Sequence, residues 1–126
     1  MNIKTGSMGF HVAFKVPNSE SKRMEEFLDK HESFMRETHH VEGNVEPIAL
    51  CYAVMKSPEL NNPLDPASGE TGFTLYGLTE IYSGAEGVQM HMKLGQEREK
   101  MFMELVALTN EYCVSGIIGA PVIKSM

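Results

Sequence analysis

Two stretches of the chain show strand-like alternation with apolar side chains on both faces. Residues 46–56 carry one apolar set at even positions and a second at odd positions, and residues 71–82 repeat the pattern. An antiparallel sheet with one face in water alternates apolar and polar residues. Both faces of a sheet built from these strands must therefore be covered. In the first stretch the two sets are Ile48, Leu50, Tyr52 and Val54, and Ala49, Cys51, Ala53 and Met55.

The rest of the chain supplies two more strands and two helical regions. Residues 9–16 alternate as a strand, and residues 113–124 predict a last strand. Apolar residues recur at helical spacing after Ser19 and stop near His39 and His40. The pattern Ser-x-x-Glu at 83–86 predicts a capping box that opens the second helical region, which Gly95 is expected to interrupt.

The order of these elements is β-α-β-β-α-β, which predicts one α+β domain over residues 9–124 with an antiparallel sheet. Residues 1–8 are expected to be an N-terminal tail, of the kind that an expression tag leaves. Residues 57–70 are rich in Pro, Asn and Asp and predict a long loop that covers a site or embraces a partner.

The helices can cover only one face of this sheet. A chain of 126 residues leaves no segment for the second face. An identical sheet from a second copy is the simplest cover, so a two-fold homodimer through the sheet faces is expected.

Charge and cysteine usage limit the partners and the compartment. The net charge is −6, and no run of Lys or Arg exceeds two residues, so neither nucleic acid nor an anionic membrane is expected as a partner. The longest apolar run, residues 47–55, is too short to cross a bilayer, and no apolar leader is visible. Cys51 and Cys113 lack the spacing of a zinc site. These features predict a cytoplasmic protein with free thiols.

Glu80 and Tyr82 end the third predicted strand, and the capped helix that follows carries His91. This Glu-x-aromatic … His pattern resembles the signature of the antibiotic biosynthesis monooxygenase family, within the dimeric α/β-barrel superfamily of ferredoxin-like domains. The resemblance covers roughly residues 9–124 and implies a ferredoxin-like fold that dimerises through its sheets. It also implies oxygenation without a cofactor, because in many members the substrate carbanion itself reduces oxygen.

Three side chains are the candidate catalytic residues. His31 lies on the apolar stripe of the first helix and is expected to face the sheet. Glu80 lies inside a strong strand, where a buried carboxylate needs a partner such as histidine. His91 is expected on the inner side of the second helix. If the three converge, they form an acid/base dyad or a mononuclear metal site of the two-His-one-carboxylate kind. The alternative is structural, as satisfied core histidines and a salt bridge.

His39 and His40 have a simpler interpretation. No pair among them and His31 has the i, i+4 spacing of a helical metal site. Both are expected at a helix C-terminus, where a partly cationic imidazole offsets the helix dipole.

The resemblance implies a small, apolar, planar substrate held between the sheet and the helices. His31 and His91 would deprotonate or polarise it, and Glu80 would fix a histidine tautomer. No resident metal or cofactor is expected. Two other functions stay open, namely a ligand-binding or stress-associated dimeric α/β-barrel protein without turnover, and a haem-binding relative. The expected substrate-binding residues are Tyr76, Tyr82, Phe27, Met35, Thr38 and Met92.

Overall fold

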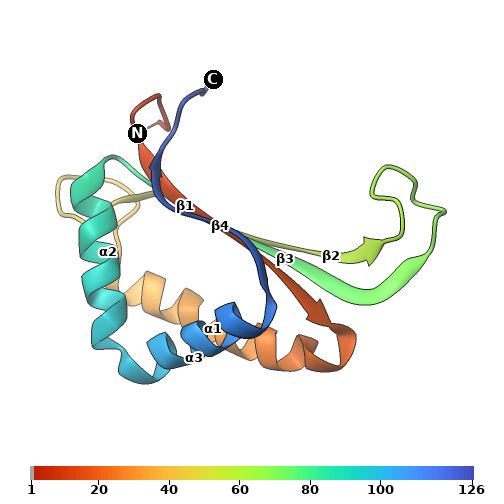
Figure 1. Cartoon of the computed structure of the whole chain (residues 1–126). Coiled ribbons are helices and arrows are strands. Elements are labelled where there is room, and N and C mark those ends of the chain that lie inside the picture. Colours follow the sequence, from red (N-terminus) through yellow and green to blue (C-terminus); the bar gives the residue numbers. More distant parts are fainter. Residues whose placement is uncertain (1) are drawn as a thin grey trace.

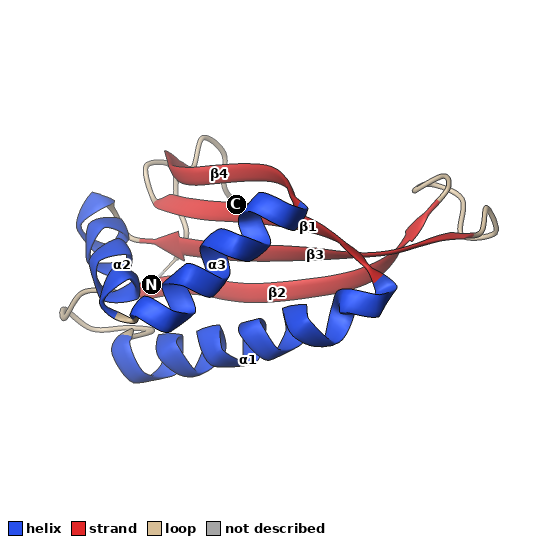
Figure 2. Cartoon of the chain, turned by 60° about the horizontal axis from the view of Figure 1, so that its bottom comes forward, coloured by secondary structure: helices blue, strands red, loops and turns tan. Residues whose placement is uncertain are grey.

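The computed structural model describes residues 2–126 and contains one four-stranded antiparallel sheet with three α-helices on one of its faces (Figures 1 and 2). The strands lie in the order β2-β3-β1-β4. The predicted α+β class with an antiparallel sheet is confirmed, and the arrangement is compatible with a ferredoxin-like fold. The elements are β1 (Met8–Pro17), a short 3-10 turn (Asn18–Glu20), α1 (Ser21–Thr38), β2 (Ala49–Leu60), β3 (Glu70–Tyr82), α2 (Ala85–Glu97), α3 (Glu99–Tyr112) and β4 (Cys113–Pro121).

The core fills the space between the helices and the sheet. Phe14 and Val16 of β1 are fully buried against Phe27 and Met24 of α1, and Leu108 of α3 joins them. The apolar stripe predicted for the first helix is confirmed, because its members are the residues that α1 buries. Within residues 2–126, no helix combines the length and apolar character needed to cross a membrane.

The order of elements differs from the predicted order. The second helical region is two helices, so the chain runs β-α-β-β-α-α-β and the prediction of a single helix there was wrong. The break falls at Arg98, whose backbone angles (φ −89°, ψ 69°) are not helical, whereas Gly95 lies inside α2. The break lets α2 stand steeply at one end of the sheet while α3 runs beside α1 (Figure 1).

The predicted capping box does not form. The helix begins one residue later than predicted, so that its N-cap is Gly84, which has no side chain to cap it. The Ser83 hydroxyl donates to Glu46 Oε2 over 3.4 Å.

The connection is shorter than the loop predicted at 57–70, because both strands extend into that stretch. β2 continues to Leu60 and β3 begins at Glu70, which leaves residues 61–69 as the connection. Pro58 does not end β2, because β2 is an edge strand and a missing N–H is tolerated there. Residues 57–73 form a hairpin arm that projects beyond the helices, at the end of the sheet opposite α2 (Figure 1). The arm therefore does not cover the space between α1 and α2.

The N-terminal tail is shorter than predicted. β1 begins at Met8, and Ser7 is fully buried. The backbone N–H of Gly6 donates to the Val122 carbonyl over 3.0 Å, and the Val122 N–H donates to the Ser7 carbonyl over 2.6 Å. These bonds tie the start of the chain to the segment that follows β4.

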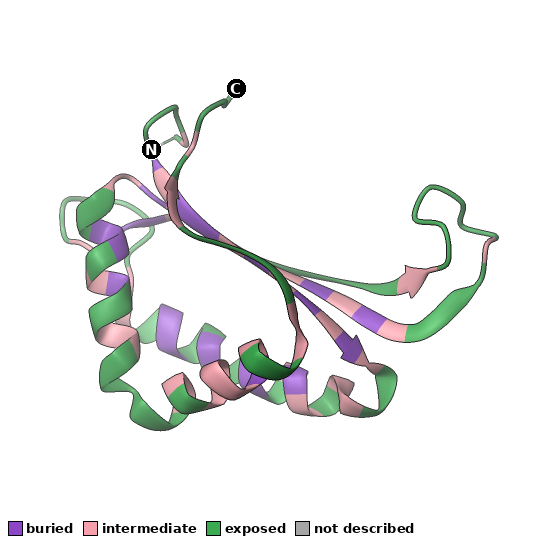
Figure 3. Ribbon diagram, viewed as in Figure 1, coloured by how far each residue is buried: buried purple, intermediate pink, exposed green. Residues whose placement is uncertain are grey.

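The face of the sheet away from the helices is uncovered (Figures 1 and 3). Buried and partly exposed residues alternate along β3, and the partly exposed set points away from the helices. Met55 on β2 is 67% exposed and Ile117 on β4 is 51% exposed. The members of this open face include His11, Ala13, Lys15, the free thiol of Cys51, Ala53, Met55, Leu75, Gly77, Thr79, Ile81 and Ile117.

Gly87 of α2 packs tightly against Tyr82 of β3, and we expect Gly87→Ala to lower the free energy of unfolding by about 1–3 kcal/mol. A Cβ there would lie 3.1 Å from Cδ1 and 3.2 Å from Cβ of Tyr82, which is fully buried. This crowding should outweigh the gain of about 1 kcal/mol in helix propensity. Gly95→Ala is the matched control, because its Cβ would meet only Phe34, at 4.0 Å. Urea denaturation should show destabilisation for the first variant alone, and equal stabilisation of both would contradict the packing described here.

Candidate functional site

One carboxylate and two imidazoles meet between the sheet and the helices. His31 of α1, Glu80 of β3 and His91 of α2 each place one ligand-type atom within 4.8 Å of the other two. Glu80 Oε2 lies 3.7 Å from His31 Nε2, and Glu80 Oε1 lies 3.4 Å from His91 Nδ1. Only 3% of the Glu80 side chain is exposed. The structure thus brings the three candidate catalytic residues together in one buried His–Glu cluster.

Strand register explains why Glu80 points at the helices. Leu78, Glu80 and Tyr82 are the buried, helix-facing positions at the end of β3. Glu80 is opposite Phe10 of β1 and Tyr52 of β2, so it lies inside the sheet rather than at an edge. His31 and His91 reach it from the helix layer because each occupies the buried side of its own helix.

Two tyrosines hold the cluster from the sheet side. The Tyr82 hydroxyl donates to Glu80 Oε1 over 2.6 Å, and the Tyr52 hydroxyl lies 3.0 Å from His31 Nδ1. No Lys or Arg within residues 2–126 pairs with Glu80. The carboxylate therefore has a phenol and two imidazoles as neighbours, and no permanent positive charge.

A chain of hydrogen bonds fixes the tautomer of His91. The Thr38 hydroxyl donates its one hydrogen to the Phe34 carbonyl over 2.7 Å, so it must accept from His39 Nδ1 at 2.8 Å. Neutral His39 then has a bare Nε2, which accepts from His91 Nδ1 at 3.0 Å. Neutral His91 consequently carries its hydrogen on Nδ1, between His39 and Glu80. Its Nε2 is left as a hydrogen-bond acceptor.

Burial shifts every titratable group of the cluster toward its uncharged form. Burial, with a smaller effect of His39, lowers the pKa of His31 to about 4 and the pKa of His91 to about 3. Burial, with a smaller effect of His40, also lowers the pKa of His39 to about 4. Burial raises the pKa of Glu80 to about 7, although the hydrogen bond from Tyr82 opposes this shift. The cluster is therefore neutral or singly negative near pH 7.

Such an arrangement has two chemical capacities. A bare imidazole nitrogen backed by a carboxylate can take a proton from a bound molecule. Two imidazoles and one carboxylate are also a donor set for a transition-metal ion. His31, Glu80 and His91 are the residues that could hold such an ion.

A small cavity adjoins the cluster on the helix side. It has a volume of about 50 Å³, which holds one or two water molecules and is far below the roughly 300–1,000 Å³ of a typical ligand pocket. Of the predicted substrate-binding residues, Phe27 and Met92 line this cavity, and Tyr82 contacts the cluster through Glu80. Its full lining is Phe27, His31, Phe34, His91, Met92, Gly95, Met101, Phe102 and Leu105.

The other predicted substrate-binding residues lie apart from this cavity. Tyr76 is four residues from Glu80 along β3, about 14 Å away, and its hydroxyl donates to Glu25 over 2.7 Å. Met35 lines a groove of about 560 Å³ between the end of α1 and β2, together with His39 and Tyr52. Thr38 acts on the cluster only through His39. The structure does not bring Tyr76 to the cluster.

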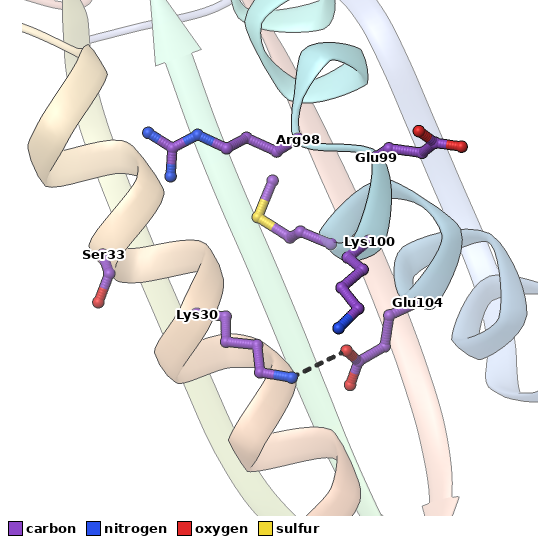
Figure 4. A pocket seen from close by; sticks show the side chains of 7 residues that line it. Lys30, Ser33, Arg98, Glu99, Lys100 and Glu104 are labelled. Atoms are coloured by element: carbon purple, nitrogen blue, oxygen red, sulfur yellow. Dashed lines mark hydrogen bonds and ion pairs between the residues drawn. The ribbon is translucent and has the colours of Figure 1, made fainter.

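A hollow of about 650 Å³ between α1 and α3 has a different character (Figure 4). Lys30 pairs with Glu104 across it over 3.2 Å. Arg98 extends toward α1 and pairs with Glu37 over 2.7 Å, while Glu99 points away (Figure 4). None of its charged side chains is buried, so it offers no buried reactive group.

Sequence reasoning missed two members of the site. His39 was expected to be a solvent-facing cap, yet its ring is half buried and bonded to His91. The available signal was the i, i+4, i+8 series of His31, Met35 and His39, which extends the buried stripe. In the sequence Tyr52 belongs to one of the two apolar sets of the strand predicted at 46–56. Only the register of β2 against β3 reveals that it is opposite Glu80.

The buried groups predict sensitivity to mild acid. His31 and His91 have folded-state pKa values below the unfolded value of 6.5, so the unfolded chain binds more protons below pH 6.5 and stability falls. Glu80 has the opposite effect, because its pKa is 4.5 in the unfolded chain and about 7 in the folded one. Between these pH values the folded state holds one more proton on Glu80, which offsets one of the protons that the unfolded histidines bind. His31, His91 and Glu80 together should cost about 1.4 kcal/mol per pH unit between pH 6 and 5, and the half-buried His39, whose pKa is also lowered, adds to this loss by an amount that solvent screening reduces. Urea titrations at several pH values measure this slope.

The Glu80→Gln variant separates these opposing effects. It removes the contribution of the carboxyl group, so its stability should fall more steeply with acid than that of the wild type. His40→Gln is the control because His40 is exposed. A flat pH profile of the wild type between pH 6.5 and 5 would contradict the buried, neutral histidines.

Comparison with known proteins gives no relative from which a role could be transferred. No protein-family model, no curated protein and no solved structure matches the chain. The geometry of the cluster is therefore the basis for assigning a function.

Proposed function

We propose that the chain is a small-molecule enzyme that removes a proton from an apolar, planar substrate at the His–Glu cluster. The observation that carries the proposal is the meeting of Glu80, His31 and His91 from three separate elements beside a cavity. A structural role would be met by a single buried His–carboxylate pair. Here one carboxylate faces two imidazoles, and a third imidazole, that of His39, orients His91.

His91 is the proposed base. Its Nδ1 hydrogen is held by His39 and faces Glu80 Oε1, which leaves Nε2 bare. When Nε2 accepts a proton, the Glu80 carboxylate stabilises the resulting imidazolium, in the manner of a carboxylate–histidine pair. His31, fixed by Tyr52, stands at the other oxygen of Glu80 and keeps the carboxylate in place.

The resemblance to the antibiotic biosynthesis monooxygenase family suggests the step that follows. A substrate CH₂ group that has lost a proton to His91 is a carbanion, which can reduce dioxygen directly. One oxygen atom stays on the carbon as a carbonyl, and the other leaves as water with the two substrate hydrogens. The substrate must widen the 50 Å³ cavity. Met92 and Met101 in its wall are flexible side chains suited to such an adjustment.

The proposed assembly is a homodimer through the open face. Apolar and small residues meet at the centre of that face, where Ala13 is opposite Gly77 and Gly77 is opposite Met55. An uncovered apolar sheet face of this kind is an interaction surface. A second copy offers the same pattern in two-fold symmetry.

Activity is tested by oxygen uptake with polycyclic phenols and ketones that have an acidic CH₂ group. We expect uptake above the spontaneous rate for the wild type and a loss of at least about 100-fold in Glu80→Gln and His91→Gln, the scale of general acid–base catalysis. His40→Gln is the matched control and should keep the wild-type rate.

Two results would reject the enzyme. Wild-type rates in both cluster variants would remove the cluster from the chemistry. Binding of the same compounds without oxygen uptake or product would favour the ligand-binding alternative.

Ala13→Arg tests the dimer. It places a cation at the centre of the open face without touching the core, so we expect a monomer by light scattering, whereas the wild type should have twice the mass of one chain. Asn110→Arg on the exposed side of α3 is the charge-matched control and should remain dimeric. A monomeric wild type would refute the proposed assembly.

A further inference from the structure

We propose that His31, Glu80 and His91 form a binding site for one divalent first-row transition-metal ion, such as Zn²⁺, Fe²⁺ or Co²⁺. This site goes beyond the proposed proton transfer, and the ion-binding inference does not depend on that reaction. It rests on the geometry, the charge and the outer partners of the three side chains.

The spacing of the three donors suits a single ion. Ligand atoms bound at about 2.0–2.2 Å around one ion lie about 3.0–3.5 Å from each other. Glu80 Oε1 and His91 Nδ1 are 3.4 Å apart, and Glu80 Oε2 and His31 Nε2 are 3.7 Å apart. These two distances are close to those around a bound ion, and all three donor atoms already lie within 4.8 Å of one another, so small side-chain adjustments would bring them onto one ion.

The charge of the site also favours an ion. Glu80 is nearly inaccessible to water, and no Lys or Arg in residues 2–126 pairs with it. A buried carboxylate is costly unless a cation or a metal compensates it. The three nearby imidazoles are neutral by burial, so they provide lone pairs and no compensating charge. A divalent ion would provide that charge and use the same lone pairs.

Outer partners orient the two histidines, as they do in established metal sites. The Tyr52 hydroxyl holds His31 at Nδ1, which aims Nε2 at Glu80. His39, fixed by Thr38, presents a bare Nε2 only 3.0 Å from His91 Nδ1. When an ion replaces the hydrogen on His91 Nδ1, His39 Nε2 is adjacent as a fourth donor. Two imidazoles and one carboxylate select transition ions over Mg²⁺ or Ca²⁺, which prefer oxygen ligands.

An ion would also change the role of His91. With the ion on Nδ1, the hydrogen of the neutral ring must move to Nε2, so His91 can no longer accept a proton there. This consequence rests on the proposed function. The ion would therefore act as an inhibitor of proton transfer at the same cluster.

The test is a titration of metal-stripped protein with Co²⁺ followed by absorption spectroscopy, and with Zn²⁺ followed by calorimetry, in a non-coordinating buffer. We expect one ion per chain, visible Co²⁺ bands of a nitrogen–oxygen site, and a higher melting temperature with the ion. His31→Gln, Glu80→Gln and His91→Gln should each weaken binding at least 100-fold. Tyr52→Phe, which removes an outer partner, should weaken it by about 10–100-fold.

His40→Gln is the control for binding at exposed surface histidines and should bind as the wild type does. If a cluster variant fails to fold, Tyr52→Phe and the wild-type Co²⁺ spectrum still decide the question. Absence of stoichiometric binding in the wild type, or loss of binding in His40→Gln alone, would overturn the site.

Turnover assays keep this inference separate from the proposed enzyme. We expect one equivalent of Zn²⁺ to suppress oxygen uptake at least 10-fold and a chelator to restore it. Stoichiometric binding that leaves turnover unchanged would overturn the inhibitory role and leave the ion site in place. Binding in a protein that never turns over would reject the enzyme alone.

Discussion

The burial of one carboxylate without a cationic partner governs this structure. Glu80 sits inside the sheet, faces the helices and is almost entirely removed from water. Such a group must be neutralised or surrounded by donors. The chain does this with the Tyr82 hydroxyl and with two imidazoles that come from α1 and α2. Gly87 allows α2 to pack closely against Tyr82, and in this position the helix holds His91 Nδ1 3.4 Å from the carboxylate.

The direction of each hydrogen bond in the cluster matters as much as the number of bonds. Thr38 gives its hydrogen to the helix backbone, and this single choice determines which nitrogen of His39 and then of His91 carries a hydrogen. A threonine in the last turn of α1 thereby determines the tautomer of a histidine on another helix. From Thr38 through His39 to His91 each hydrogen bond has one direction, which makes this part of the cluster a defined polar site.

The sequence predicted those parts of the fold that depend on local periodicity. The stripe of α1 and the alternation of β3 identified His31 and Glu80 as inward-facing residues because both patterns are strong. Elements that depend on tertiary context were less predictable. Pro58 is accommodated because β2 is an edge strand, and the helical region after Ser83 breaks at Arg98 rather than at a glycine. Tyr52 and His39 were missed because strand register and helix docking, which no periodicity encodes, place them in the cluster.

The three cluster residues lie on separate elements, and the β2–β3 hairpin lies between the two histidines in the chain. His31 precedes the β2–β3 hairpin, Glu80 ends it, and His91 lies beyond it. Glu80 is enclosed only after β1 has paired with β3 across a long stretch of chain, and such non-local pairings are the slow part of folding. Until then its carboxylate remains hydrated and charged. The cluster is therefore assembled only once these non-local strand pairs have formed and both helices have docked on the sheet.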